Sequence, residues 1–222
     1  MSAPVEIKFG TDGWRAVIGE DFTYESLRRV ADASGRVFAK DHPGGRVLVG
    51  YDTRFEAGTF AKAAAEVLAA HGLEVILSDS YMPTPALCWS VARDDRAVGG
   101  VMLTASHNPA RYLGFKIRMS DGGASPVALT DEVEAALVDD VPEARGTYET
   151  VDLMTPYVET LTRMVDAEAI RAAVKELSVA TMKIGEAINK GSSSGAGGGG
   201  ADKDSSSKDG NTYDADVKEE GK

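Results

Sequence analysis

The sequence predicts an α/β protein with a mostly parallel, mixed sheet and helices on both faces. Apolar residues at helical spacing alternate along the chain with short β-branched runs, so that helices and strands follow one another in turn. Strands separated by helices need crossover connections, which favour parallel pairing and cover both faces of the sheet. The 222 residues, 43% hydrophobic and 27% charged, fit one globular domain of about 150 residues and a further segment.

Six segments carry the two patterns in alternation. The helical segments are residues 23–40, 58–72 and 83–95, and the β-type segments are residues 46–54, 73–79 and 97–105. Thr23 is a candidate N-cap of the first helix, Gly72 ends the second and Pro85 opens the third. A fourth helical pattern covers residues 156–174 and leads out of the domain.

Charge and composition exclude several classes of partner. The net charge of -11, with no Lys/Arg cluster, disfavours nucleic acid and anionic membranes, although a local basic pocket for a small phosphorylated molecule is compatible with it. No basic and apolar leader opens the chain and no run reaches about 18 apolar residues, so we expect a cytoplasmic protein. Cys88 cannot form an intrachain disulfide and is expected to pack on a helix face.

Four loops are expected on one rim, because ligands of open α/β sheets lie beyond the carboxyl ends of the strands. They are "FGTDGWR", "YDTR", "MPTP" and "TASHNP". In the last of these, Ser106 follows a buried strand, where a ligand can reach it. An adjacent Ser-His pair is no catalytic dyad by itself, and Asn-Pro is an ordinary turn. The hydrolase elbow and the P-loop motif do not occur, and "DKDSSSKDG" lacks the glycine and glutamate of a calcium loop.

In this order and spacing, "FGTDGWR", "YDTR", "PTP" and "TASHNPARYLGFK" resemble the first domain of the α-D-phosphohexomutases, the phosphoglucomutase and phosphomannomutase family. The resemblance covers roughly residues 6–169. It implies an isomerase of the phosphotransferase type in carbohydrate metabolism, which interconverts hexose 1-phosphate and hexose 6-phosphate through a phosphoserine. The residue that matches the phosphoserine is Ser106, and the implied partner is a hexose phosphate.

The resemblance also assigns roles to the neighbouring residues. Lys116 is the candidate proton shuttle or electrostatic partner, and Arg15 would orient phosphoryl oxygens with its planar donor fork. His107 and Asn108 are expected to shape the loop or support substrate binding. The family uses Mg²⁺, with the phosphoserine oxygen of Ser106 as one ligand, and an activator of the glucose 1,6-bisphosphate type. Phosphoryl transfer needs such cations because negative charge spreads in its transition state.

The sequence departs from the family pattern in several places. Ala16 stands where a glycine is usual, and Leu113 stands where an asparagine is frequent. The family's acidic metal loop, sugar-selecting loop and C-terminal phosphate loop have no match after residue 120. We therefore expect a truncated mutase that is inactive by itself. A sugar-phosphate binding module and a non-functional fusion fragment remain alternatives, and a serine hydrolase would need an elbow that the sequence lacks.

The sequence predicts three regions. Residues 1–169 form the phosphohexomutase domain, residues 170–190 a helix, and residues 191–222 a disordered, Gly/Ser-rich acidic tail that can bury almost no apolar surface. The last 50 or so residues resemble the C-terminal helix and tail of DnaK-type chaperones. The sequence leaves open which hexose is the substrate, the oligomeric state, and whether the joined segments arose by gene rearrangement.

Overall fold

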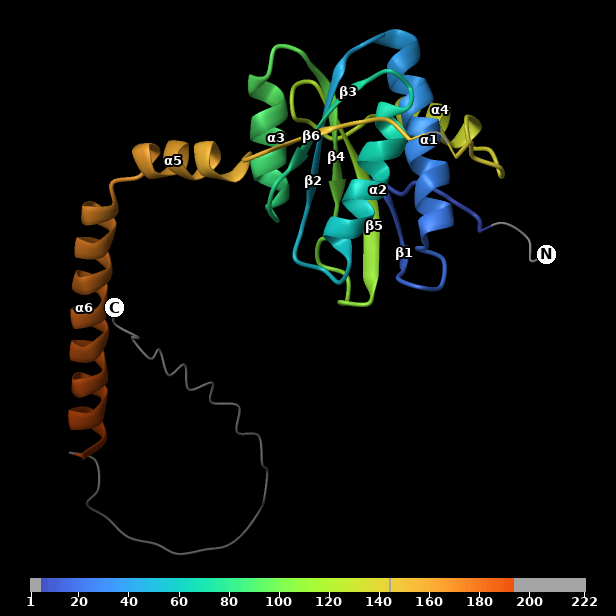
Figure 1. Cartoon of the computed structure of the whole chain (residues 1–222). Helices are drawn as coiled ribbons and strands as arrows, with labels where there is room; N and C mark the ends of the chain where they lie inside the picture. Colours follow the sequence, from blue (N-terminus) through green and yellow to red (C-terminus); the bar gives the residue numbers. More distant parts are fainter. Residues whose placement is uncertain (1–4, 144, 194–222) are drawn as a thin grey trace, which may run out of the picture. The chain divides into compact units, whose positions relative to one another are not determined.

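A computed structural model describes residues 5–143 and 145–193 of the chain (Figure 1). The chain divides into two compact units, the first ending at Asp166 and the second beginning at Ala167. Most of the segment predicted as a disordered tail, residues 194–222, lies outside the described residues. Within the described ranges, no helix combines the length and the apolar character that crossing a membrane requires.

The first unit is built on a mixed sheet, as the sequence predicts. Its strands are β1 (Trp14–Val17), β2 (Arg46–Tyr51), β3 (Glu74–Ser78), β4 (Ala97–Leu103), β5 (Tyr112–Met119) and β6 (Glu149–Val151). Their spatial order is β1-β5-β4-β2-β3-β6 (Figure 1). The neighbouring pairs β4–β2, β2–β3 and β3–β6 are parallel, whereas β5 is antiparallel to both β4 and β1. The carboxyl ends of β2, β3 and β4 therefore meet at one edge.

Helices cover both faces of this sheet. They are α1 (Tyr24–Asp41), α2 (Ala57–Ala69), α3 (Thr84–Arg93), α4 (Val127–Ala135) and α5 (Met154–Met164). In β2, Val47 and Val49 belong to the apolar cluster that contains α1 and α2, while Leu48 belongs to a second cluster with α3. Alternate side chains of a strand point to opposite faces, so each cluster is the core of one face. Tyr157 of α5 packs against the second cluster.

The predicted helix ends have local causes. The side chain of Thr23 accepts a hydrogen bond from the backbone N–H of Ser26, and the Ser26 hydroxyl accepts one from the N-cap backbone, a reciprocal pair that satisfies two free N–H groups. Gly72, just after α2, adopts a φ of 78°, which glycine tolerates without strain. Pro85 lies in the first turn of α3, where a missing N–H costs nothing.

The single helix predicted over residues 156–174 was wrong. Helix α5 ends at Met164, Val165 is extended, and a new helix, α6, covers Ala167–Ser193. The break has a reason in the sequence, because Asp166 is a residue type that favours the position before a helix. The chain thus divides after Asp166, whereas the predicted boundary is residue 169. Helix α6 also continues three residues beyond the predicted end at residue 190.

Candidate active site

The serine loop, residues 104–112, leaves the buried end of β4 and reaches the surface within two residues. Thr104 and Ala105 are buried, while Ser106 and His107 are exposed. The backbone N–H of Ser106 donates to Oγ1 of Thr104 at 2.9 Å, and that of Asn108 donates to the carbonyl of Ala105 at 3.0 Å. The resulting turn is tight, and Ser106 has a left-handed φ of 58°. Such strain costs about 1–3 kcal/mol in a non-glycine residue and is common at functional sites.

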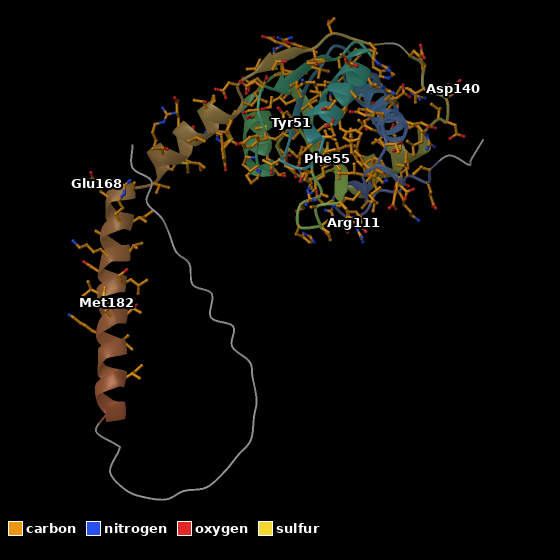
Figure 2. All side chains as sticks on the ribbon, turned by 60° about the horizontal axis from the view of Figure 1, so that its bottom comes forward. Tyr51, Phe55, Arg111, Asp140, Glu168 and Met182 are labelled. Atoms are coloured by element: carbon orange, nitrogen blue, oxygen red, sulfur yellow. The ribbon has the colours of Figure 1, made fainter. Side chains whose placement is uncertain are left out.

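Ser106 lines a polar hollow of about 510 Å³. The hollow is lined by Asp52, Thr53, Arg54 and Phe55 from the loop after β2, and by Ser106, Asn108 and Ala110 from the serine loop. Phe55 and Arg111, labelled in Figure 2, mark these two loops. The backbone N–H of Asp52 donates to the carbonyl of Leu103 at 3.1 Å, which joins the ends of β2 and β4. The loops after these parallel strands meet at one edge, as the sequence predicts.

A cationic cluster lies on the β1–β5 side of the sheet. The apolar side chains of β5, Leu113, Phe115 and Ile117, belong to the core of the α1–α2 face. Strand alternation therefore places Lys116 and Arg118 on the opposite face, with Arg15, which pairs with Gly114 across β1 and β5. The Lys116 and Arg118 side chains are 3% and 7% exposed. Their shared partner is Asp12, whose carboxylate oxygens lie 2.5 Å from Lys116 Nζ and 2.9 Å from Arg118 Nη1.

The electrostatics of this cluster favour an anion. Burial by itself would raise the pKa of the Asp12 carboxyl, but hydrogen bonds from Lys116 and Arg118 outweigh burial and hold that pKa below its ordinary value. Asp12 is therefore charged, and Arg15 approaches it at 3.8 Å. Three cations against one carboxylate leave a local charge of +2. A positive site of this kind can attract a phosphate although the chain as a whole is acidic.

The glycine of the loop before β1 is needed for this packing. Gly13 has a φ of 97°, and a Cβ at this position would lie 2.6 Å from the carbonyl oxygen of Phe115 and 2.8 Å from Cγ of Lys116. Any side chain would thus displace β5 at Lys116. Glycine adopts the positive φ of this position without the strain that another residue would have.

The structure brings the expected site residues into two places. Ser106 and Asn108 line the hollow, and His107 is exposed beside it. Lys116 and Arg15 belong to the cationic cluster and are not among the described residues that line the hollow. The roles assigned to these five residues remain predictions.

Sequence reasoning missed three residues that the geometry makes prominent. They are Asp12, Arg54 and Arg118. The first two lie inside the quoted motifs "FGTDGWR" and "YDTR". Arg118 follows Lys116 by two residues, a spacing that places both on one face of a strand.

The two departures from the family pattern face each other. Ala16 and Leu113 are partners across β1 and β5, and their exposed fractions are 8% and 0%. Both belong to the core of the α1–α2 face. Leu113 thus adds buried apolar surface there and supplies no polar group to the serine loop.

The described residues do not fit a Mg²⁺ site by themselves. Mg²⁺ needs several oxygen ligands in near-octahedral geometry. Asp52 is the carboxylate of the hollow, and it is paired with Arg54 at 3.3 Å. Within residues 5–143 and 145–193, no group of three or more His, Cys, Asp or Glu side chains could hold a metal ion.

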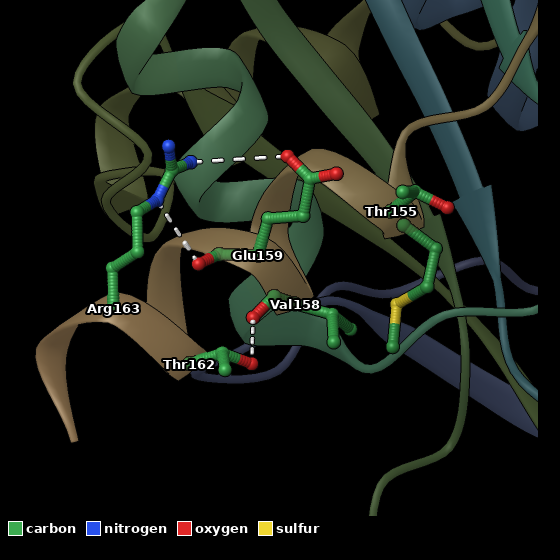
Figure 3. A pocket seen from close by; sticks show the side chains of 6 residues that line it. Thr155, Val158, Glu159, Thr162 and Arg163 are labelled. Carbon is green, nitrogen blue, oxygen red and sulfur yellow. Dashed lines mark hydrogen bonds and ion pairs between the residues drawn. The ribbon is translucent and has the colours of Figure 1, made fainter. Parts of the chain in front are cut away.

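A second hollow, of about 460 Å³, lies along α5 and carries no candidate chemistry (Figure 3). One helix supplies all its lining residues, and the side chains of Glu159, Thr162 and Arg163 bond within that helix. Glu159 pairs with Arg163 at 3.8 Å, and the hydroxyl of Thr162 donates to the carbonyl of Val158 at 2.9 Å (Figure 3). The hollow at Ser106 contains two of the expected site residues, Ser106 and Asn108, and is the candidate active site.

Comparisons with known proteins identify the family of this domain. Residues 6–141 match the family model for the phosphoglucomutase/phosphomannomutase α/β/α domain I. A phosphoglucosamine mutase of Methylococcus capsulatus is 36% identical over 160 residues, which are 72% of this chain and 33% of the relative. One from Hahella chejuensis is 38% identical over 127 residues, which are 57% of this chain and 28% of the relative. The chain thus spans about a third or less of these relatives.

A solved structure from Thermus thermophilus, assigned there as a phosphomannomutase, is 44% identical with a TM-score of 0.69. The match covers 76% of this chain and 38% of that protein. The family model extends over more than half of the chain, and it includes the serine loop, the Asp12 cluster and both core layers. The chain belongs to the phosphoglucomutase/phosphomannomutase family.

Proposed function

We propose that this domain carries a phosphoryl group on Ser106 and exchanges it with a hexose phosphate, moving phosphate between the 1- and 6-positions. The observation that carries the proposal is the strained, exposed Ser106 in a polar hollow at the edge of a sheet that also holds the Lys116–Arg118 cluster. The relatives are named for phosphoglucosamine, phosphoglucose and phosphomannose, so the proposal extends to the class of hexose phosphates and not to one sugar.

The proposed step is balanced by proton movement between two oxygens. Oγ of Ser106 forms a bond to phosphorus while the bond from phosphorus to the sugar oxygen breaks. The serine proton leaves Oγ and the sugar oxygen gains one. Lys116 is the candidate shuttle for this proton or the cation that balances the charge, and Arg15 would orient the phosphoryl oxygens. His107 and Asn108 would support the loop.

Completion of the cycle needs groups that these residues do not supply. In the family's chemistry Mg²⁺ would neutralise phosphate charge, with an oxygen of phosphorylated Ser106 as one ligand, and a glucose 1,6-bisphosphate-type activator would supply the phosphoryl group. The distal phosphate also needs a clamp, since positioning provides most of the rate. We therefore expect no steady turnover of glucose 1-phosphate or mannose 1-phosphate by the 222-residue chain.

Two finer proposals concern the setting of the reaction. A charged sugar phosphate crosses a membrane at high energetic cost, so we place the reaction in the cytoplasm. The resemblance of the C-terminal 50 or so residues to DnaK-type tails stays a prediction, and we assign these residues no part in phosphoryl transfer. A fusion fragment without function remains an alternative, and loss of all phosphate uptake would favour it.

Intact-mass spectrometry tests the proposal. The chain is incubated with glucose 1,6-bisphosphate and Mg²⁺, and we expect one added phosphoryl group on Ser106. Ser106→Ala should remove the label, and Arg15→Ala or Lys116→Ala should reduce it. His71→Ala, at the end of α2, is the control that should retain it. Phosphate on the serines of "GSSSGAGGGG", unaffected by Ser106→Ala, would contradict the assignment.

A binding module without transfer is the second candidate, because the hollow and the cationic cluster need no chemistry to hold an anion. Isothermal titration of Ser106→Ala with glucose 1,6-bisphosphate separates the two functions. Binding by this variant, together with an unlabelled wild-type chain, would favour the module.

A further inference from the structure

Arg54 makes an unusual set of contacts with the serine loop. Its Nη2 donates to the carbonyls of Ser106 at 2.8 Å and Asn108 at 2.7 Å. Its Nη1 donates to the carbonyls of Pro109 at 2.9 Å and Tyr112 at 3.0 Å. One side chain from the loop after β2 therefore binds four carbonyls in a stretch of seven residues.

The four Nη donors of the guanidinium are all used by the serine loop. Arginine carries five N–H donors, two on each Nη and one on Nε. The four Nη donors are matched by the four carbonyls, and Nε lies 3.3 Å from Oδ2 of Asp52. The Arg54 side chain is also 13% exposed. A substrate phosphate could bind Arg54 only by displacing the serine loop or Asp52.

Asp52 fixes the arginine to the sheet. Its Oδ1 accepts the backbone N–H of Arg54 at 3.0 Å, and its own backbone N–H donates to Leu103 at the end of β4. The contacts thus run from the ends of β2 and β4 through Asp52 and Arg54 to the serine loop. These are rigid elements, because both strands are central in the sheet.

The carbonyl contacts also set the direction of the peptide groups. In a planar trans peptide, the C=O and the following N–H point in opposite directions. When the Ser106 carbonyl points to Arg54, the N–H of His107 points away from it, and the same holds for Pro109 and the N–H of Ala110. The positive guanidinium polarises both peptide groups, which strengthens their N–H donors.

We propose that Arg54 is the positioning residue of the serine loop: its four Nη hydrogen bonds to loop carbonyls, together with the ion pair between Nε and Asp52, hold Ser106 in its left-handed conformation for phosphoryl transfer. Arg54 itself does not bind phosphate. The role in transfer rests on the proposed function of Ser106, whereas the hold on the loop does not.

The test compares Arg54→Lys with Arg96→Lys. Lysine keeps the charge at position 54 but has three donors and no planar fork, so it cannot reproduce the four hydrogen bonds to the loop carbonyls. Arg96, an exposed arginine paired with Glu74, is the matched control. We measure the initial rate of Ser106 labelling by glucose 1,6-bisphosphate and hydrogen exchange of the backbone amides. Arg54→Lys should slow labelling about 10- to 100-fold, because small misplacement of reacting groups is costly.

Hydrogen exchange separates a local role from general unfolding. Arg54→Lys should accelerate exchange in residues 105–112 and leave residues 97–103 of β4 unchanged, and Arg96→Lys should change neither. Guanidinium ion added to Arg54→Ala should restore part of the labelling rate, because the free ion can occupy the space of the removed side chain and donate to the same carbonyls. Unchanged labelling and unchanged loop exchange in Arg54→Lys would overturn the proposal, as would faster exchange spread equally over β4.

Failure of the two proposals can be distinguished. If the unaltered chain takes up no label, the proposed function of Ser106 fails, and exchange in residues 105–112 still decides whether Arg54 holds the loop. If the unaltered chain and Arg54→Lys are labelled at equal rates, the function stands and the positioning role fails.

Discussion

Replacing Asp12 by Asn should destabilise the domain, because Lys116 and Arg118 would lose the anion that they share. Their side chains are 3% and 7% exposed, so the variant would bury two cations without a negative partner. Breaking a buried ion pair from one side costs about 3–5 kcal/mol. Asp12 is 35% exposed, and solvent screening lowers the expected loss to about 2 kcal/mol. At about 2–4 °C per kcal/mol for a chain of this size, the unfolding temperature should fall by about 4–8 °C.

Thermal unfolding with and without inorganic phosphate is the assay. Phosphate should stabilise Asp12→Asn more than the unaltered chain, since it replaces the missing carboxylate and binds the folded state selectively. Asp131→Asn, which neutralises an exposed carboxylate on α4, is the control and should shift the unfolding temperature little. Equal unfolding temperatures for the two variants, or no added effect of phosphate on Asp12→Asn, would refute the reasoning.

Three further predictions concern stability. The pKa of Asp12 is lowered in the folded state, so the contribution of its carboxylate to the free energy of unfolding is present above the unfolded pKa and is lost as the pH falls through the folded pKa. Below pH 3.8, the ordinary pKa, the free energy of unfolding should therefore fall less steeply with pH in Asp12→Asn than in the unaltered chain, as measured by acid unfolding with circular dichroism. Ser106→Gly should raise the free energy of unfolding in urea by about 0.5–1 kcal/mol, because relief of the left-handed strain exceeds the added entropy of the unfolded chain, and Ser106→Ala should not. Gly13→Ala should lower that free energy by about 2 kcal/mol or more, and an unchanged urea midpoint would show that β5 moves away at little cost.

The sequence predicted the elements whose patterns repeat over many residues. Helix α1 has a long amphipathic stripe and an N-cap at Thr23, and β2 to β4 are short apolar runs between helices. The expected position of the loops followed from the same alternation of helices and strands, because neighbouring parallel strands have their carboxyl ends at the same edge of the sheet. These features depend on local periodicity and on general rules of chain connection, both of which a single sequence carries.

A mixed sheet was predicted, but the residues of its strands β1, β5 and β6 were not. Strand β1 has four residues, and its first two, Trp14 and Arg15, belong to the motif "FGTDGWR", which was interpreted as a loop. The three residues of β6 are too few to define a strand. Strand β5 does show the alternation of a strand, because apolar Leu113, Phe115 and Ile117 alternate with Gly114, Lys116 and Arg118. Its first residues belong to the motif "TASHNPARYLGFK", which was interpreted as a loop. The sequence therefore predicted the serine loop but not β5, the strand that carries Lys116 and Arg118.

For the candidate site, the sequence predicted which types of residue take part but not which residues contact one another. Ser106 and Lys116 follow from a motif, but the partner of Lys116 is Asp12, which lies 104 residues away in the sequence. Arg54 lies 52 residues before Ser106, whose carbonyl it binds. Such pairs depend on the strand order of the folded sheet, in which β1 and β5, and likewise β2 and β4, are neighbours. Residue type and spacing do not determine them.

The position of Asp12 reconciles an acidic protein with the anionic substrate proposed for it. A net charge of -11 acts over the whole surface, but salt screens exposed charges beyond about 8 Å. Lys116 and Arg118 are buried, so their attraction for an anion is screened much less, and in the free domain Asp12 satisfies it. A bound phosphate would have to share these cations with Asp12 or displace its carboxylate. Asp12 thereby stabilises the cluster and favours a dianionic phosphate, which carries more charge than the carboxylate, over weaker anions.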